Sequence, residues 1–298
     1  MRLSEGDTKA GVARPIPESK SVRSTDPSLV SSTKLVGDVE QFLWAVSAEV
    51  DQEYLDAPWV LKLYPTALEA SAYFQSQYRP RSYGPDEVKE EPSEEGQLRS
   101  KANASRRASG RLRRYAVGNR LNRFGTLTYA VACTEPKQVS KDVGTFFRDL
   151  RNEIGRPFPY VWAREWHPGG HGLHVHFLVG RFIRQRLIRE VWGRGLVDIR
   201  ARGQVRLGEG SAAEARNAAR YMAKYIRKAT DEDRIPGMHR YEVAQDFQPK
   251  PVFLRASSEF DAVRAASQKM GGSPAVHWRG FDDPEWSGPI VAWMAWDR

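Results

Sequence analysis

The spacing of apolar positions changes along the chain from helical to strand-like, which predicts a mixed fold. In residues 143–154 apolar side chains recur at i, i+3, i+4, i+7 and i+11, the spacing of one helix face. Similar spacing predicts a helix over residues 182–192, with Gly193 as its C-cap. A third helix is expected to begin at Ser211, because Ser211 and Glu214 form a capping box.

Shorter segments between these helices have the β-branched and aromatic content of strands. We expect strands over residues 124–131, 160–166, 173–179 and 196–200. A Pro-Gly-Gly turn at 168–170 joins two of them, which predicts an antiparallel hairpin. The predicted fold class is therefore α+β, with a central antiparallel sheet of about five strands of the split βαβ, ferredoxin/RRM-like type and helices packed on it.

The segments on either side of this region differ in composition. Residues 1–35 are rich in Ser, Thr, Pro and Lys and are expected to be a disordered tail. Amphipathic stretches over 38–46 and 65–74 predict helices, so residues 36–98 are interpreted as a helical accessory region. This region ends in an acidic linker over residues 84–97.

The predicted central domain covers residues 99–230, and residues 231–298 form a C-terminal extension that packs on it or completes it. A strand is expected near 252–254 and a helix near 260–270. Residues 290–296 are apolar on both faces of a strand, which favours core packing for their tryptophans over stacking on bases.

Charge restricts the kind of partner. The chain has 298 residues and a formal net charge of +9, which suits a polyanion. No acidic residue lies between Glu95 and Glu135, and the basic residues in that interval are Arg99, Lys101, Arg106, Arg107, Arg111, Arg113, Arg114, Arg120 and Arg123. Such a block attracts phosphate groups, and a solvated helix face is the alternative interpretation.

Membrane and disulfide chemistry are not expected. The chain has no apolar run of 18 residues and begins without the apolar stretch of a signal peptide, so we expect a cytoplasmic protein with no membrane partner. Its single cysteine, Cys133, excludes an intramolecular disulfide and a cysteine-rich zinc module.

Four of the six histidines lie within ten residues, from His167 to His176. In a strand, residues two apart share a face, so His174 and His176 are expected side by side, with the apolar positions 175, 177 and 179 on the opposite face.

Glu165, on the adjoining strand of the hairpin, adds a carboxylate to the histidine pair. Two imidazoles and one carboxylate suit Mn²⁺, or Mg²⁺ with phosphate and water in the remaining positions. The alternative is a pair that forms hydrogen bonds or stacks on a nucleic acid. His167 and His171 lie in the turn, and we interpret them as loop residues rather than as part of a closed zinc site.

The helix that begins at Ser211 has two distinct arcs. The apolar arc contains Ala215, Ala218, Ala219, Met222 and Ile226, and the neighbouring arc contains Tyr221, Lys224, Tyr225 and Lys228. Tyrosine is a weak nucleophile at its ordinary pKa of about 10, so attack on phosphorus needs nearby cations or a metal ion. The two lysines meet that need, although core or interface packing is the commoner role of such a phenol pair.

Three segments, 124–129, 174–176 and 221–228, have the order and approximate spacing of the three motifs of the HUH endonuclease superfamily. The chain resembles a rolling-circle replication initiator (Rep) protein of the two-tyrosine type, over about residues 105–230. The Tyr-x-x-Lys-Tyr-x-x-Lys pattern of the third segment is the most discriminating motif. Gly125 in the first segment stands where such strands usually have a bulkier residue.

The resemblance implies a role for each matching residue. His174, His176 and Glu165 would bind Mg²⁺ or Mn²⁺, Tyr221 and Tyr225 would be the nucleophiles, and Lys224 would assist at the phosphate. The DNA-binding residues would be Arg106, Arg107, Arg111, Arg113, Arg114 and Lys228.

In this family, one tyrosine nicks a strand at a replicon origin through a 5′-phosphotyrosine and frees a 3′-OH that primes synthesis, and the second tyrosine can then attack. The expected partners are single-stranded or hairpin origin DNA, a DNA polymerase and, because the chain has no nucleotide-binding P-loop, a host helicase.

Other functions fit some of the same residues. A relaxase or a two-tyrosine transposase would use the same chemistry on different DNA. A DNA-binding repressor without activity would keep the sheet, although the retained tyrosines, lysines and histidines argue against it. A zinc-stabilised RNA-binding module would need a closed metal site.

Overall fold

The chain divides into two units, Met1–Asp51 and Gln52–Arg298. The computed structural model describes parts of the second unit only, namely residues 57–75, 93–167, 169–201, 211–228, 238–284, 286 and 288–297. The predicted tail, the predicted helix over 38–46 and the acidic linker up to residue 92 lie outside these residues. Among the helices described, none has the length and apolar character needed to cross a membrane.

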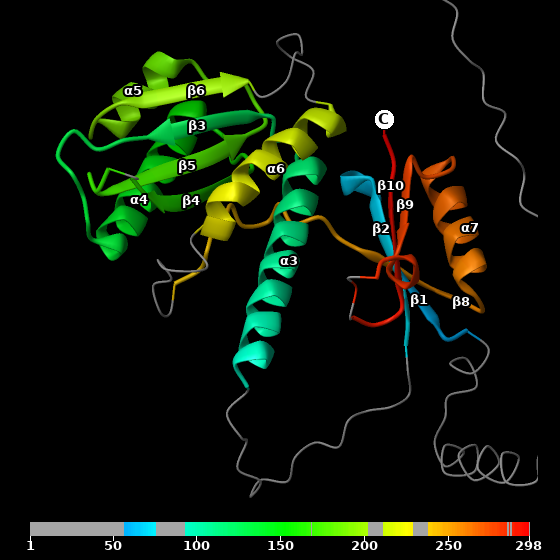
Figure 1. Cartoon of the computed structure of the whole chain (residues 1–298). Helices are drawn as coiled ribbons and strands as arrows, with labels where there is room; N and C mark the ends of the chain where they lie inside the picture. Colours follow the sequence, from blue (N-terminus) through cyan, green and yellow to red (C-terminus); the bar gives the residue numbers. More distant parts are fainter. Residues whose placement is uncertain are drawn as a thin grey trace, which may run out of the picture. The chain divides into compact units, whose positions relative to one another are not determined.

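The central domain is built on a five-stranded sheet in which each pairing of neighbouring strands is antiparallel (Figure 1). The strand order is β6-β3-β5-β4-β7. The bounds are β3 (Arg123–Leu127), β4 (Tyr160–Trp166), β5 (Leu173–Val179), β6 (Val197–Ala201) and β7 (Glu242–Val243). Because β5 lies between β3 and β4, the connection from β3 through helix α4 (Pro136–Ile154) to β4 is a split βαβ unit. The predicted fold class and hairpin are confirmed.

Strand β5 packs on both of its faces. Val175, Phe177 and Val179 point into an apolar core formed with α4 and with helix α5 (Gln185–Trp192), as the alternation of the sequence predicted. Leu178 belongs to a second core on the opposite face. Helix α6 (Ala212–Lys228) and helix α3 (Glu94–Gly118) cover that face. The sheet is therefore the middle layer of three.

Helix α6 begins where the sequence predicted. The Ser211 backbone N–H donates to the Glu214 carboxylate over 3.1 Å, and the Glu214 N–H donates to the Ser211 hydroxyl over 3.2 Å. The whole predicted apolar arc is buried, comprising Ala215, Ala218, Ala219, Met222 and Ile226. Burial of this arc fixes the rotation of the helix and turns the tyrosine arc toward the edge of the buried face.

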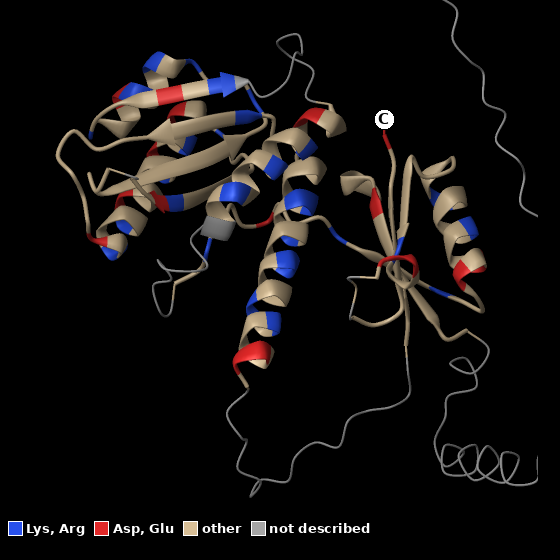
Figure 2. Cartoon of the chain, viewed as in Figure 1, with Lys and Arg blue, Asp and Glu red and all other residues tan. Residues whose placement is uncertain are grey.

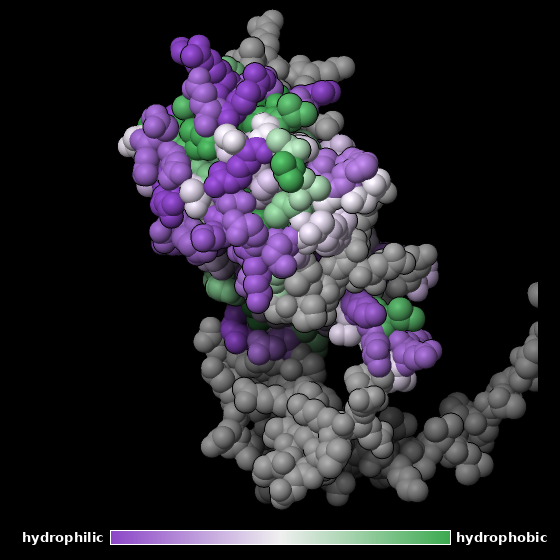
Figure 3. All heavy atoms as spheres, turned by 90° about the vertical axis from the view of Figure 1, so that its left-hand side faces the viewer, coloured by the Kyte–Doolittle hydropathy of each residue, from purple (hydrophilic) through white to green (hydrophobic). Residues whose placement is uncertain are grey.

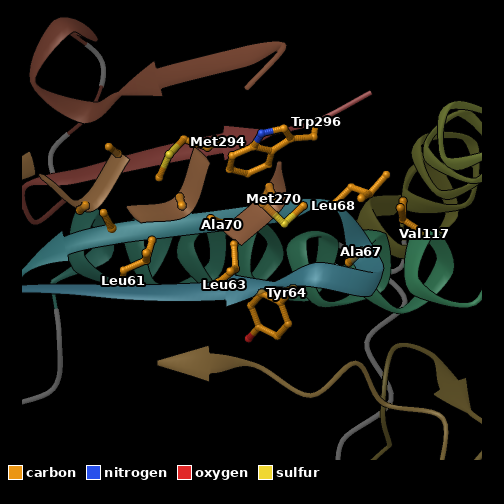
Figure 4. Close-up of a cluster of buried hydrophobic side chains, with 14 of the residues drawn as sticks. Leu61, Leu63, Tyr64, Ala67, Leu68, Ala70, Val117, Met270, Met294 and Trp296 are labelled. Carbon is orange, nitrogen blue, oxygen red and sulfur yellow. The ribbon is translucent and has the colours of Figure 1, made fainter. Parts of the chain in front are cut away.

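A second sheet, the flanking sheet, joins segments from both sides of the central domain. Its strand order is β8-β1-β2-β10-β9. Its elements are β1 (Trp59–Tyr64), β2 (Glu69–Phe74), β8 (Val252–Ala256), α7 (Glu259–Met270), β9 (Val276–Arg279), η3 (Gly280–Asp282) and β10 (Val291–Ala295). Figure 4 shows part of its core, where Met294 and Trp296 lie near Leu68 and Met270. The predictions of a strand near 252, a helix near 260–270 and core packing at the C-terminal end are confirmed.

The predicted helix over residues 65–74 is wrong. Residues Pro65–Ala67 form a 3₁₀ turn, η2, which ends at Leu68 with φ of 52°, and Glu69–Phe74 is strand β2. Strand β2 pairs with β1 on one side and with β10 on the other, and Ala70 and Ala72 are fully buried. Pairing on both sides overrides the local helical preference of its alanines and glutamate.

A buried carboxylate connects the flanking sheet to helix α3. Glu69 accepts hydrogen bonds from Arg113 at 2.8 and 3.1 Å and from Arg114 at 3.0 Å. Burial alone would raise the pKa of the Glu69 carboxyl, but the hydrogen bond and charge of Arg113, with smaller contributions from Trp293 and Arg114, hold the pKa below its ordinary value. Glu69 is therefore a structural anion that neutralises two arginines of the basic block.

We expect Glu69→Gln to lower the free energy of unfolding by about 2–3 kcal/mol, because it leaves two guanidinium groups without their carboxylate. The control is Glu95→Gln, which removes an exposed partner of Arg99 on the same helix and should cost less than about 1 kcal/mol. Urea unfolding measures both. Since the folded-state pKa of Glu69 lies below 4.5, the difference from the wild type should be full above that pH and shrink as pH falls through the folded-state pKa. Equal losses for the two variants would contradict the structural role.

Gly125 provides space for an aromatic ring. A Cβ atom at this position would lie 2.1 Å from Cζ of Phe177, its cross-strand partner on β5. The Phe177 side chain is fully buried and part of the core beneath the sheet. The small residue in the first motif is thus explained by the large one opposite.

Gly125→Ala should destabilise the protein by about 2 kcal/mol or more, because the methyl group has to displace the Phe177 ring. Gly144→Ala is the matched control: Gly144 is exposed in α4, a methyl group added there would meet nothing within 4 Å, and alanine should add about 1 kcal/mol. Thermal unfolding should show shifts of opposite sign. A neutral Gly125→Ala would disprove the contact as a constraint on the sheet.

Hydrophilic side chains cover much of the face drawn in Figure 3, with apolar residues between them. Large apolar residues of the central domain that are exposed include Val131, Phe182 and Leu196. None of these three belongs to the site described next.

Candidate functional site

The candidate site lies on the face of the central sheet that helix α6 covers. Thr126 on β3 and Ala163 on β4 are both register partners of His176 on β5, so His176 occupies the middle of three adjacent strands. Its side chain is buried, with 6% of the residue exposed. The prediction that the histidine pair lies on central strands is confirmed.

Two neighbours fix the orientation of the His176 imidazole. Its Nδ1 lies 3.1 Å from the Thr126 hydroxyl, and its Nε2 lies 2.8 Å from Oε2 of Glu165. The tautomer with its proton on Nδ1 donates to Thr126 and leaves the Nε2 lone pair beside the carboxylate. In that form, nitrogen and oxygen donors face the same point.

His174 lies opposite Glu165 in the strand register, one pleat away from His176 on the same face. Burial, and next the positive charge that His167 and His176 would carry, lower the pKa of His174, while Glu165 opposes this effect. His174 is therefore held in the neutral form that can bind a cation. Its ring centroid lies 4.6 Å from that of His167, which in turn lies 5.2 Å from that of His171.

The donor types fit a divalent cation, although the ligand set is not assembled. Within the described ranges, no group of three or more His, Cys, Asp or Glu side chains is arranged to hold a metal ion. One imidazole nitrogen and one carboxylate oxygen are in contact, and a second imidazole shares their face. His167 and His171 occupy the turn, as predicted, but no sequence pattern indicated that His167 lies against His174.

The two tyrosines of α6 meet at His176. The Tyr225 ring stacks on the imidazole with a centroid distance of 3.9 Å and an interplanar angle of 29°. The Tyr225 hydroxyl donates to the Tyr221 oxygen over 2.8 Å. The exposed Lys224 places its Nζ 5.5 Å from the centroid of the Tyr221 ring. The side chain of Lys228 lies outside the described residues, although its backbone belongs to α6.

Phe124 and Thr126 are site residues to which the sequence assigned no role of their own. The buried Phe124 ring lies 4.8 Å from the Tyr221 ring, 5.7 Å from the Tyr225 ring and 5.3 Å from the His176 ring, centroid to centroid. Both residues lie on β3 two positions apart, on the face that α6 covers. The period of two was the available signal, but the strand pairing was needed to show what each side chain contacts.

The candidate DNA-binding arginines separate into two groups (Figure 2). Arg106, Arg107 and Arg111 are exposed on α3. Arg113 and Arg114 are paired with Glu69, so their positive charge is already neutralised. Both predicted alternatives therefore apply, since part of the block is an exposed basic face and part stabilises the fold.

Comparison with known proteins covers the segment that contains this site. No curated protein and no solved structure matches the chain. Residues 122–230 match a protein family described as replication-associated protein ORF2, and this span contains the histidine pair, Glu165 and both tyrosines. The resemblance to replication initiator proteins is thus supported for residues 122–230, the part of the chain that carries the candidate site.

Proposed function

We propose that this protein is a replication initiator that nicks and rejoins single-stranded DNA at a replicon origin through a 5′-phosphotyrosine intermediate. The observation that carries the proposal is the contact of two hydrogen-bonded phenols with His176, which is itself bonded to Glu165. A pair of tyrosines used only for packing would not need to adjoin this donor set. The family match over residues 122–230 supports replication as the process.

In this proposal Glu165, His174 and His176 hold a divalent metal ion, Mg²⁺ or Mn²⁺. When bound, the ion supplies positive charge that polarises the scissile phosphate. Thr126 orients His176 by its hydrogen bond to Nδ1, which keeps Nε2 directed toward Glu165.

The phenol oxygen of one tyrosine attacks phosphorus, a new P–O bond forms, and the bond from phosphorus to the 3′ oxygen breaks. The phenol loses its proton, and the departing 3′ oxygen gains one. If Tyr221 attacks, the Tyr225 hydroxyl stabilises the developing phenolate through the existing hydrogen bond, and the Lys224 ammonium favours the same charge. Phe124 and the stacked His176 ring hold the two phenols in place.

The covalent link keeps the energy of the broken phosphodiester, so rejoining needs no nucleotide cofactor. Because the second phenol lies within hydrogen-bond distance of the first, it can attack the next junction after one round of synthesis. A host helicase would separate the strands, and a DNA polymerase would extend the 3′-OH.

The covalent intermediate is directly testable. The wild-type protein, incubated with Mn²⁺ and a randomised pool of single-stranded oligonucleotides, should form an adduct that survives denaturation, and sequencing the attached DNA would identify its site. Replacing both Tyr221 and Tyr225 with Phe should reduce the adduct by at least about 1,000-fold. Tyr73→Phe on strand β2 is the control and should leave it unchanged. An adduct that persists in the double variant would refute the tyrosine mechanism.

The role of Thr126 is testable by metal affinity alone. Thr126→Val keeps the shape of the side chain but loses the hydroxyl, and should weaken Mn²⁺ binding by about 10- to 100-fold, as measured by electron paramagnetic resonance of free Mn²⁺. Thr126→Ser keeps the hydroxyl and should bind Mn²⁺ nearly as the wild type does. Unchanged affinity in Thr126→Val would exclude the hydroxyl as a positioning group for His176.

A further inference from the structure

A pocket of 520 Å³ lies on the opposite side of the exposed arc of α6 from the tyrosines. Helices α3 and α6 and strands β9 and β10 of the flanking sheet line it, and its polar and aromatic side chains include Asn217, Arg220 and Trp293. Its volume lies in the range of about 300–1,000 Å³ that is usual for sites that bind small molecules. None of the three residues has a role in the proposed reaction.

Three arginines line this pocket, and two of them are fixed by carboxylates. Arg113 is bonded to Glu69, and Arg216 is bonded to Asp297 and to the backbone oxygen of Leu68. These pairs build the wall of the pocket. Arg220 is exposed and forms no ion pair within the described part of the chain, so its guanidinium is available to an incoming anion.

An exposed stripe connects the pocket to the tyrosines. Ala213, Asn217, Arg220 and Lys224 are all exposed, and their spacing of i, i+4, i+7 and i+11 puts them on one line along α6. At one end of the stripe the Lys224 ammonium lies over the Tyr221 ring. Asn217 and Arg220 line the pocket. A polyanionic strand bound at Tyr221 can therefore follow polar side chains into the pocket.

We propose that this pocket binds one unpaired nucleotide of the DNA strand, next to the point of cleavage. Arg220 binds its phosphate, Trp293 offers an aromatic surface to its base, and the Asn217 amide reaches the polar edge of that base. The identification of the ligand as single-stranded DNA rests on the proposed function. The pocket would give the enzyme a preference for sequences in which that nucleotide is unpaired.

The test uses the full chain in EDTA, so that binding is measured without cleavage. A fluorescent oligonucleotide, recovered from a randomised pool by binding to the wild-type protein, is scanned with single abasic substitutions, and affinity is measured by fluorescence anisotropy. One position should lose about 10-fold in affinity. In the double variant Asn217→Ala/Arg220→Ala, and separately in Trp293→Leu, the intact oligonucleotide should bind about 10-fold more weakly, and the abasic substitution should cost little more.

Arg189→Ala is the matched control, since it removes an equally exposed cation from α5 and should keep the position-specific loss. A scan without a sensitive position, or a loss that persists undiminished in both pocket variants, would overturn the proposal. The adduct assay on the wild type is independent of this result. Adduct formation without a sensitive position would leave the proposed function intact and reject the pocket, whereas a sensitive position that disappears in the variants, without any adduct, would support the pocket and reject the nicking reaction.

Discussion

The site depends on the alternation of side chains along strand β5, which is packed on both faces. Residues 175, 177 and 179 fill the core with α4 and α5, so His176 has to point toward α6. A shift of one residue would bury the imidazole among phenylalanines and expose the core residues, which makes the register strongly determined. The Phe177 ring over Gly125 reinforces it, because a side chain at position 125 has no room in this register. The same register brings Thr126 and Glu165 to either side of His176.

Helix α6 meets this arrangement with a stripe made mainly of alanines. Small side chains allow a helix backbone to approach a sheet closely, and Ala218 and Ala219 share a core with Ala163 and Phe124. The capping box at Ser211 fixes where the helix begins, and the buried stripe fixes its rotation. Two ring contacts with His176 and Phe124 then follow from the position of Tyr225 in the next arc. Stability and the proposed chemistry therefore use neighbouring faces of one helix.

The central sheet, its hairpin and the faces of α6 could be predicted, because each follows from a period of two or of about 3.6 within one segment. Strand β2 could not, since its partners β1 and β10 are set by pairing rather than by local composition, which favours a helix. The histidine and tyrosine pairs were identified from spacing and from the family resemblance. The hydrogen bond between Thr126 and His176 joins residues 50 positions apart and depends on the strand register, which no local pattern contains.

The basic block shows why charge alone does not identify a phosphate-binding surface. Arg113 and Arg114 have the same sequence signal as Arg106 and Arg107, but the Glu69 carboxylate, 44 and 45 residues earlier, removes them from the set that can bind phosphate. The pairing also has a mechanical consequence. Glu69 ties strand β2 to α3, α3 packs beside α6, and Ala212 and Ala215 of α6 share a core with Leu68 and Met294 of the flanking region. The flanking sheet thus helps to hold the helix that carries both tyrosines, so its integrity matters to the site even though it contributes none of the proposed catalytic groups.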